Sequence, residues 1–342
     1  MTSSRRQALI FLIALMPLLL LAVIAALNIG ATGVHLSALW HGTTDPDIRA
    51  DRIVLLRIRG PRVVMSGLTG AALAVAGAVM QGLFRNPLAD PGLIGVSSGA
   101  ALATACMIVL GGPWLVSGAW GVWAIPAAGM AGSFASAYLL YLFATRGGVT
   151  SVSTILLAGV ALGAFSGALT GILIFRANDT ALRDLTFWTM GSFAGATWSR
   201  IGLLCPFLCV AAAVTARLAT PLNALLLGES DAHLIGYPVE RIKRLAMVAV
   251  ACAVGPTVSF VGAIGFVGVI VPHLVRLVTG PDHRLVLPGS ALLGASLMIV
   301  ADTLARVIAI PADVPVGIVT AVLGTPVFVW LLSGAHGREV VS

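Results

Sequence analysis

Long apolar runs alternate with short polar breaks along almost the whole chain of 342 residues. Each run is close to the roughly 20 residues that an α-helix needs to cross a bilayer. None shows the in-and-out alternation of a membrane β-barrel. The pattern predicts an all-α polytopic membrane protein with spans at about 8–29, 63–84, 93–112, 120–145, 152–175, 198–218, 285–304 and 314–334.

One apolar stretch, 243–279, is too long for a single helix and short for two. It contains Pro256, Gly262 and Pro272, residues that end or bend helices. Hydropathy alone therefore allows nine or ten spans. We expect a broken pair at about 243–260 and 263–278, which brings the number of spans to ten.

Composition agrees with a lipid environment. The chain is 58% hydrophobic and 10% charged, with a mean hydropathy of +1.03, whereas soluble domains carry about 25% charged residues. The net charge of +7 is spread between the apolar runs, which favours membrane-flanking loops over a nucleic-acid surface. All four cysteines fall inside apolar runs without a CxxC spacing, so we expect free thiols and no metal site.

Arg5 and Arg6 precede the first span and place the N-terminus in the cytoplasm. With ten spans, both termini are cytoplasmic, and the chain forms one permease domain, 1–342. Its parts are a first span (1–29), a periplasmic segment (30–62), spans two to six (63–218), a cytoplasmic segment (219–242), spans seven to ten (243–334) and a tail (335–342). The five arginines of the periplasmic segment 30–62 then lie outside, where the charge rule does not explain them.

The sequence contains no energy source of its own. A Walker A loop needs a lysine after glycine, and the only lysine, Lys243, follows "ERI". The span centres lack the acids or histidines that ion-coupled carriers use. A separate ATPase is the remaining source, and the segment 221–244 offers it two short helices closed by Gly228 and Gly236; the alternative is an ordinary connecting loop.

Six segments resemble the FecCD-type permeases of bacterial ABC importers for ferric siderophores, haem and vitamin B12. They read "LRIRGPR", "GAVMQGLFRNPLADPGLIGVSSGAAL", "ILLAGVALGAFSGAL", "LLLGESDAHLIGYP", "GFVGVIVPHLVRLVTGPDHRLVLPGSALLGASLMIVADTLAR" and "VPVGIVTAVLGTPVFVWLL". The resemblance covers about 52–334, in order and with matching spacing. "TFWTMGSFAGATW" is more similar to the haem branch than to the others.

The resemblance implies a type II ABC importer permease fold with ten helices per chain, in the bacterial inner membrane. It further implies a homodimer with one pathway, a pair of cytoplasmic ATPases that bind ATP and magnesium, and a periplasmic binding protein. No cofactor is held permanently, and haem is the expected transported ligand. A ferric siderophore or vitamin B12 is the alternative cargo, and an ion-coupled carrier the alternative machine.

Carried over residue by residue, the resemblance assigns three groups of sites. Arg59, Arg62 and Arg306 are expected to meet acidic residues of the binding protein; alternatively, Arg306 pairs with Asp302 and Arg62 only extends to the interface. The ATPase coupling segment comprises Leu227, Gly228, Glu229, Ala232, Ile235 and Gly236. The gate falls on Val152 and Ser153, and span position adds Thr154, Ser166 and Thr170 to the pathway.

Two further features are interpreted as structural. In "NPLADPG", Asn86 and Asp90 are expected to cap amides freed by the prolines. His35, His41, His273 and His283 are expected to cap helices or lie at the surface, because a strong axial bond to haem iron would hinder release of the cargo. No catalytic residue is predicted.

Overall fold

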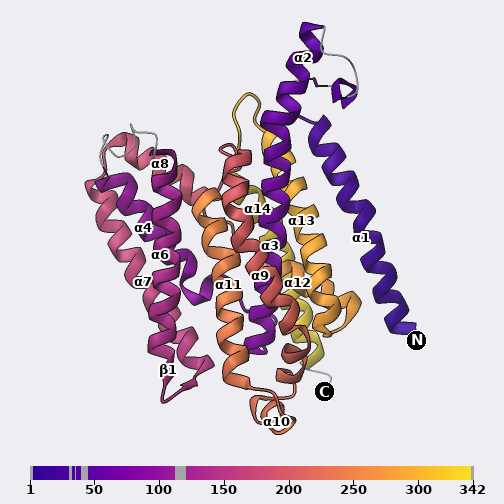
Figure 1. Ribbon diagram of the computed structural model, residues 1–342, viewed down its shortest axis with the longest axis vertical. Coiled ribbons are helices and arrows are strands. Elements are labelled where there is room, and N and C mark those ends of the chain that lie inside the picture. Colours follow the sequence, from indigo (N-terminus) through magenta and orange to yellow (C-terminus); the bar gives the residue numbers. More distant parts are fainter. Residues whose placement is uncertain (1–2, 31–32, 35, 40–44, 112–120, 340–342) are drawn as a thin grey trace.

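The computed structural model describes residues 3–30, 33–34, 36–39, 45–111 and 121–339, and these residues are almost wholly helical (Figure 1). The described strands are β1 (Thr145–Arg146) and β2 (Val149–Thr150), which pair in an antiparallel hairpin. The all-α prediction is confirmed.

Seven helical segments are long and apolar enough to cross a membrane, and three apolar helices are shorter. The seven lie within α1 (Ser3–Asn28), the segment Pro46–Phe84, α6 (Gly121–Ala144), α7 (Val152–Arg176), α9 (Trp198–Leu225), α11 (Val239–Val261) and α13 (His283–Val307). The shorter ones are α4 (Val96–Leu110), α12 (Val267–Thr279) and the apolar part of α14 (Val316–Glu339). Ten spans require all three short helices to cross, so that number stays a prediction. Residues 112 and 120, at the predicted ends of two spans, lie outside the described residues.

The predicted break in 243–279 is confirmed, because α11 ends at Val261 and α12 begins at Val267. Gly262 ends α11 with a φ of +81°, a left-handed conformation that suits glycine. A methyl group there would overlap the carbonyl oxygen of Trp188. Close packing against α8 (Asp179–Met190) therefore holds the break in place.

One predicted helix start is wrong, and the segment before residue 63 contains more helix than its polar sequence indicates. No separate helix begins near Pro221 in the described chain; α9 continues through this proline to Leu225, since Leu222 and Leu225 are buried in the core. The predicted periplasmic segment before residue 63 is partly helical. A helix α2 (Pro46–Ile53) and a π-helical turn η2 (Val54–Arg59) run directly into α3 (Gly60–Phe84).

Helices α3, α11 and α13 form the buried centre of the bundle. Glycines bring the backbone of α3 against those of α13 and α12, because a Cβ on Gly70 would overlap the carbonyl oxygen of Gly294 in α13 and one on Gly77 that of Gly268 in α12. Small residues at helix crossings supply van der Waals packing that apolar contact with lipid cannot replace. In contrast, α1 and α7 expose most of their apolar side chains.

The bundle has two distinct ends (Figure 1). Helices α2 and α8 mark one end, and the β-hairpin and α10 (Glu229–Leu234) mark the other. Helix α1 begins, and α14 ends, on the α10 side. We refer to these as the α2 end and the α10 end.

Candidate functional sites at the two ends of the bundle

A buried ionic cluster lies at the α2 end, where α3 meets α13. Arg62, in the first turn of α3, donates from Nε to both carboxylate oxygens of Asp302 at 3.0 Å, and its Nη2 lies 2.9 Å from the same carboxylate. Its Nη1 donates to Asp313 at 2.6 Å. Asp313 belongs to the loop between α13 and α14, so a single guanidinium joins three segments of the chain.

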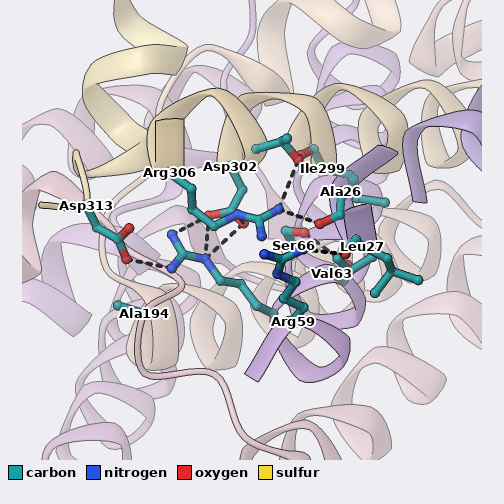
Figure 2. Close-up of polar contacts among 12 residues, drawn as sticks. Ala26, Leu27, Arg59, Val63, Ser66, Ala194, Ile299, Asp302, Arg306 and Asp313 are labelled. Carbon is teal, nitrogen blue, oxygen red and sulfur yellow. Dashed lines mark hydrogen bonds and ion pairs between the residues drawn. The ribbon is translucent and has the colours of Figure 1, made fainter. Parts of the chain in front are cut away.

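Arg306 completes the cluster from α13. Its Nε lies 3.4 Å from Asp302, four residues earlier on the same helix, and its Nη2 donates to the carbonyl oxygen of Ala26 at 3.0 Å. In Figure 2, Asp302 lies beside Arg306, and a series of dashed contacts runs from Asp302 to Asp313. Asp302 itself is 1% exposed. A carboxylate buried this deeply needs such partners, because an unpaired buried charge is costly.

Arg59, the last residue of η2, is directed at α1. Its Nη1 donates to the carbonyl oxygens of Leu27 and Asn28 at 2.7 and 2.9 Å (Figure 2). These carbonyls belong to the last turn of α1 and have no acceptor role within the helix. The negative end of the helix dipole lies there as well, so cations stabilise it. Two guanidiniums thus fasten α1, an otherwise poorly buried helix, to the bundle.

The three predicted docking arginines are therefore brought together, but they point inward. Arg59, Arg62 and Arg306 are 4%, 7% and 7% exposed. The alternative pairing of Arg306 with Asp302 is present, and Arg62 is held by carboxylates rather than extended to the surface. Contact with an acidic partner stays a prediction. The sequence reasoning missed Asp313, which carries no motif and lies eleven residues from Asp302.

At the α10 end, the predicted coupling segment forms a projecting short helix. Glu229 begins α10, and Gly228 and Gly236 flank it with φ values of +123° and +92°. Within α10, the side chain of Ala232 is fully buried, whereas those of Leu227 and Ile235, on either side of the helix, are exposed. Leu234 shows an exposed apolar side chain beside them. A solvated loop would not gather such leucines, so the segment suits contact with another protein.

The predicted gate and pathway residues all lie on α7, but at different heights. Val152, Ser153 and Thr154 form its first turn, and the hydroxyl of Ser151 caps this turn by accepting the N–H of Thr154 at 3.2 Å. This turn adjoins the β-hairpin at the α10 end. Thr170 lies near the opposite end of the helix, so the structure does not bring the five residues into one site.

Ser166 lines a cavity of about 750 Å³ between α4, α6 and α7. Its walls are mainly apolar, with Leu102, Met107 and Phe165 among them. The side chain of Ser166 is buried. This hollow is wide open on one side of the single chain, and its lining is apolar.

The structure describes two of the histidines that were predicted to cap helices or lie at the surface, His273 and His283, and the prediction is wrong for His283 because its side chain is buried. His283 is fully buried, and its Nδ1 lies 2.8 Å from the Asn223 side-chain oxygen, which also accepts the His283 backbone N–H. His273 is partly buried. His35 and His41 lie outside the described residues. Among the residues that the structure describes, no group of histidines, cysteines and acids could hold a metal, and the four cysteines are free.

The turn between α3 and α4 follows the capping prediction. The Asn86 side chain accepts the N–H of Leu88 at 2.9 Å, and Asp90 accepts that of Gly92 at 2.6 Å. Burial raises the pKa of the Asp90 carboxyl, while its bond to the Gly92 amide acts in the opposite direction. The turn is architectural.

Comparison with known proteins gives a consistent result. A model of the FecCD transport family matches residues 18–334. The chain is 44% identical over 289 residues to the cobalamin import system permease protein BtuC of Halobacterium salinarum, covering 84% of this chain and 75% of that one. It is 41% identical over 322 residues to the hemin transport system permease protein HmuU of Yersinia pestis, covering 92% and 93%.

A solved structure has the same architecture. It is described as an inward-facing conformation of a metal-chelate type ABC transporter. It superposes with a TM-score of 0.84 at 30% identity, over 94% of this chain and 98% of that chain. The fold predicted from sequence, that of a type II ABC importer permease, is therefore confirmed.

Proposed function

The chain belongs to the FecCD transport family and is a permease subunit of an ABC importer, and from this premise we propose that its cargo is haem. The observation that carries the proposal is the 41% identity to a hemin permease over nearly the full length of both chains. The 750 Å³ apolar cavity is in keeping with a large, planar, mainly apolar ligand. Vitamin B12 is the second candidate, favoured by the 44% identity to a cobalamin permease.

In the proposed orientation the α10 end faces the cytoplasm and the α2 end the periplasm. A periplasmic binding protein would deliver haem at the α2 end, close to Arg59, Arg62 and Arg306. An ATPase pair that binds ATP and magnesium would dock on Leu227–Gly236, where the side chains of Leu227 and Leu234 are exposed. Both termini are then cytoplasmic, as expected for an inner-membrane protein with arginines before its first span.

Two copies of the chain would share one pathway. In the single chain, α7 presents an apolar face that includes Leu157 and Phe175, which are 74% and 91% exposed. Helix α14 adds Val322 and Trp330. We place the second copy against α7 and α14, with the gate residues Val152 and Ser153 near the cytoplasmic end of the shared interface.

An ion-coupled mechanism is the weaker candidate. Such carriers need a carboxyl or imidazole that can gain and lose a proton within the membrane. The buried carboxylate of Asp302 is engaged in ion pairs with Arg62 and Arg306. ATP bound by partner chains is the energy source that the geometry favours.

A reconstitution experiment tests the proposal. The permease would be assembled with its ATPase and binding protein in proteoliposomes, and uptake of haem, cobalamin and a ferric siderophore compared with and without ATP. We expect ATP-dependent uptake of haem above the other two. Preferential uptake of cobalamin would transfer the function to the second candidate. Uptake driven by a proton gradient without ATPase would refute the ABC mechanism.

A further inference from the structure

Lys243, the only lysine of the chain, is buried near the start of α11. Its ammonium group donates to the carboxylate of Glu229 at 2.6 Å, to that of Glu240 at 3.1 Å and to the carbonyl oxygen of Thr150 at 2.7 Å. A lysine ammonium has three donors. All three are therefore satisfied, each by a different segment of the α10 end: α10, α11 and β2.

Thr150 is held from both sides. Its carbonyl oxygen accepts from Lys243, and its backbone N–H donates to the second carboxylate oxygen of Glu240 at 2.8 Å. Glu240 thereby binds the lysine with one oxygen and Thr150 with the other. We call Lys243, Glu229, Glu240 and Thr150 the lysine clamp.

The clamp reaches the start of α7. Thr150 is the last residue of β2, and the next residue, Ser151, is the N-cap of α7. The backbone of Ser151 also donates to Ala144, at the end of α6, at 3.0 Å. The position of Thr150 therefore sets the position of the first turn of α7, which contains Val152 and Ser153.

The other side of the clamp is α10. Glu229 is its first residue, and the helix packs on α9 and α11 between two glycines in left-handed conformations. These glycines allow α10 to tilt as a unit. If α10 moves away with Glu229, a buried ammonium loses a charged partner, which is costly. If Lys243, Glu240 and Thr150 move together with Glu229, the ammonium group keeps its partners and the cost is avoided.

We propose that Lys243 is a positioning residue that transmits displacement of α10 to the first turn of α7. The inference rests on the proposed function, because the force that displaces α10 is taken to come from the docked ATPase. It goes further by naming the side chain through which coupling segment and gate are joined. Lys243 makes this link directly, because its ammonium group binds both Glu229 of α10 and the carbonyl oxygen of Thr150 in β2.

The test uses the complete complex of permease, ATPase and binding protein in lipid, in a background whose native cysteines are replaced. A spin label on Arg146→Cys reports the β-hairpin, and its distance to the same label in the second copy is measured with and without ATP. The variants are Lys243→Gln, Lys243→Arg and Glu229→Gln. Arg217→Gln, an exposed cation on α9, is the matched control.

We expect Lys243→Gln to lower transport per ATP hydrolysed by about tenfold or more, since a charge-assisted hydrogen bond of this kind corresponds to at least that factor. The ATP-dependent change in label distance should shrink, while the ATPase stays bound. Lys243→Arg, which keeps charge and donors, should restore both readouts in part. Arg217→Gln should behave as the reference.

Glu229→Gln guards against a folding defect, because it removes only the negative charge on the α10 side of the clamp and leaves Lys243 bound to Glu240 and Thr150. Coupling should again fall while the complex stays assembled. Unchanged coupling and label movement in this variant would overturn the inference, whether or not Lys243→Gln assembles. A reference complex that transports nothing with ATP would instead overturn the proposed function, and the inference with it.

Discussion

Removing the charge of Asp302 gives a sharp test of the ionic cluster. Asp302→Asn keeps the shape of the side chain and one acceptor oxygen, but leaves Arg62 and Arg306 buried without their shared carboxylate. Asp313→Asn removes the other carboxylate of Arg62. The two carboxylates differ in burial, because the side chain of Asp302 is 2% exposed and that of Asp313 is 39% exposed.

The expected magnitudes follow from this difference. Breaking a buried ion pair by removing one partner costs about 3–5 kcal/mol; since asparagine retains an acceptor, we expect ~3 kcal/mol for Asp302→Asn. A partly exposed pair is worth about 1 kcal/mol or less, which is the expectation for Asp313→Asn. The gap of ~2 kcal/mol corresponds to roughly a 30-fold difference in the unfolding equilibrium.

Unfolding in detergent micelles, followed by helical circular dichroism along a gradient of denaturing detergent, measures these differences. Asp184→Asn, an exposed carboxylate on α8, serves as the control and should change nothing. Equal effects of Asp302→Asn and Asp313→Asn would show that the buried contacts do not stabilise the bundle as argued.

Three further outcomes are expected. Gly77→Ala should destabilise the fold by about 1–3 kcal/mol, because its methyl group would overlap the backbone of α12; Gly171→Ala, facing open space, should not, by the same unfolding assay. Leu234→Asp should prevent co-purification of the ATPase, since a charge replaces an exposed apolar contact. Arg62→Gln should weaken capture of the binding protein on immobilised permease. Asp313→Asn removes a carboxylate that competes for Arg62 and should strengthen capture. Stronger capture by Arg62→Gln than by Asp313→Asn would contradict docking through Arg62.

Hydropathy and residue chemistry predicted much of the bundle. The break in 243–279 was predictable because glycine and proline interrupt the apolar run, and the observed chain breaks between Val261 and Val267. The end of α9 was not, because Pro221 is a general helix breaker, and only the burial of neighbouring leucines keeps the helix going. Local signals cannot reveal such tertiary packing.

The α10 end and the ionic cluster at the α2 end also differ in how far the sequence predicts them. Gly228 and Gly236 marked the two ends of α10 in the sequence, whereas the exposure of Leu227 and Leu234 is known only from the structure. The partners of Arg62 could not be found from spacing, because Asp302 and Asp313 lie about 240 and 250 residues further along the chain. Lys243 was noticed only as a lysine that is not part of a Walker loop; its contacts with Thr150 and Glu229 depend on how three segments pack.

The continuous helix from Pro46 to Phe84 has a consequence for a partner protein. Its 39 residues span about 58 Å at 1.5 Å per residue, roughly twice the hydrocarbon thickness of a bilayer. About half of the helix therefore extends beyond the thickness of the hydrocarbon layer. Arg59 and Arg62 hold this helix about a third of the way along, and Gln81 ties the far end of α3 to α12 by donating to the carbonyl oxygen of Val269 at 3.0 Å. A protein that contacts α2 binds one end of the same continuous helix that forms the buried centre of the bundle.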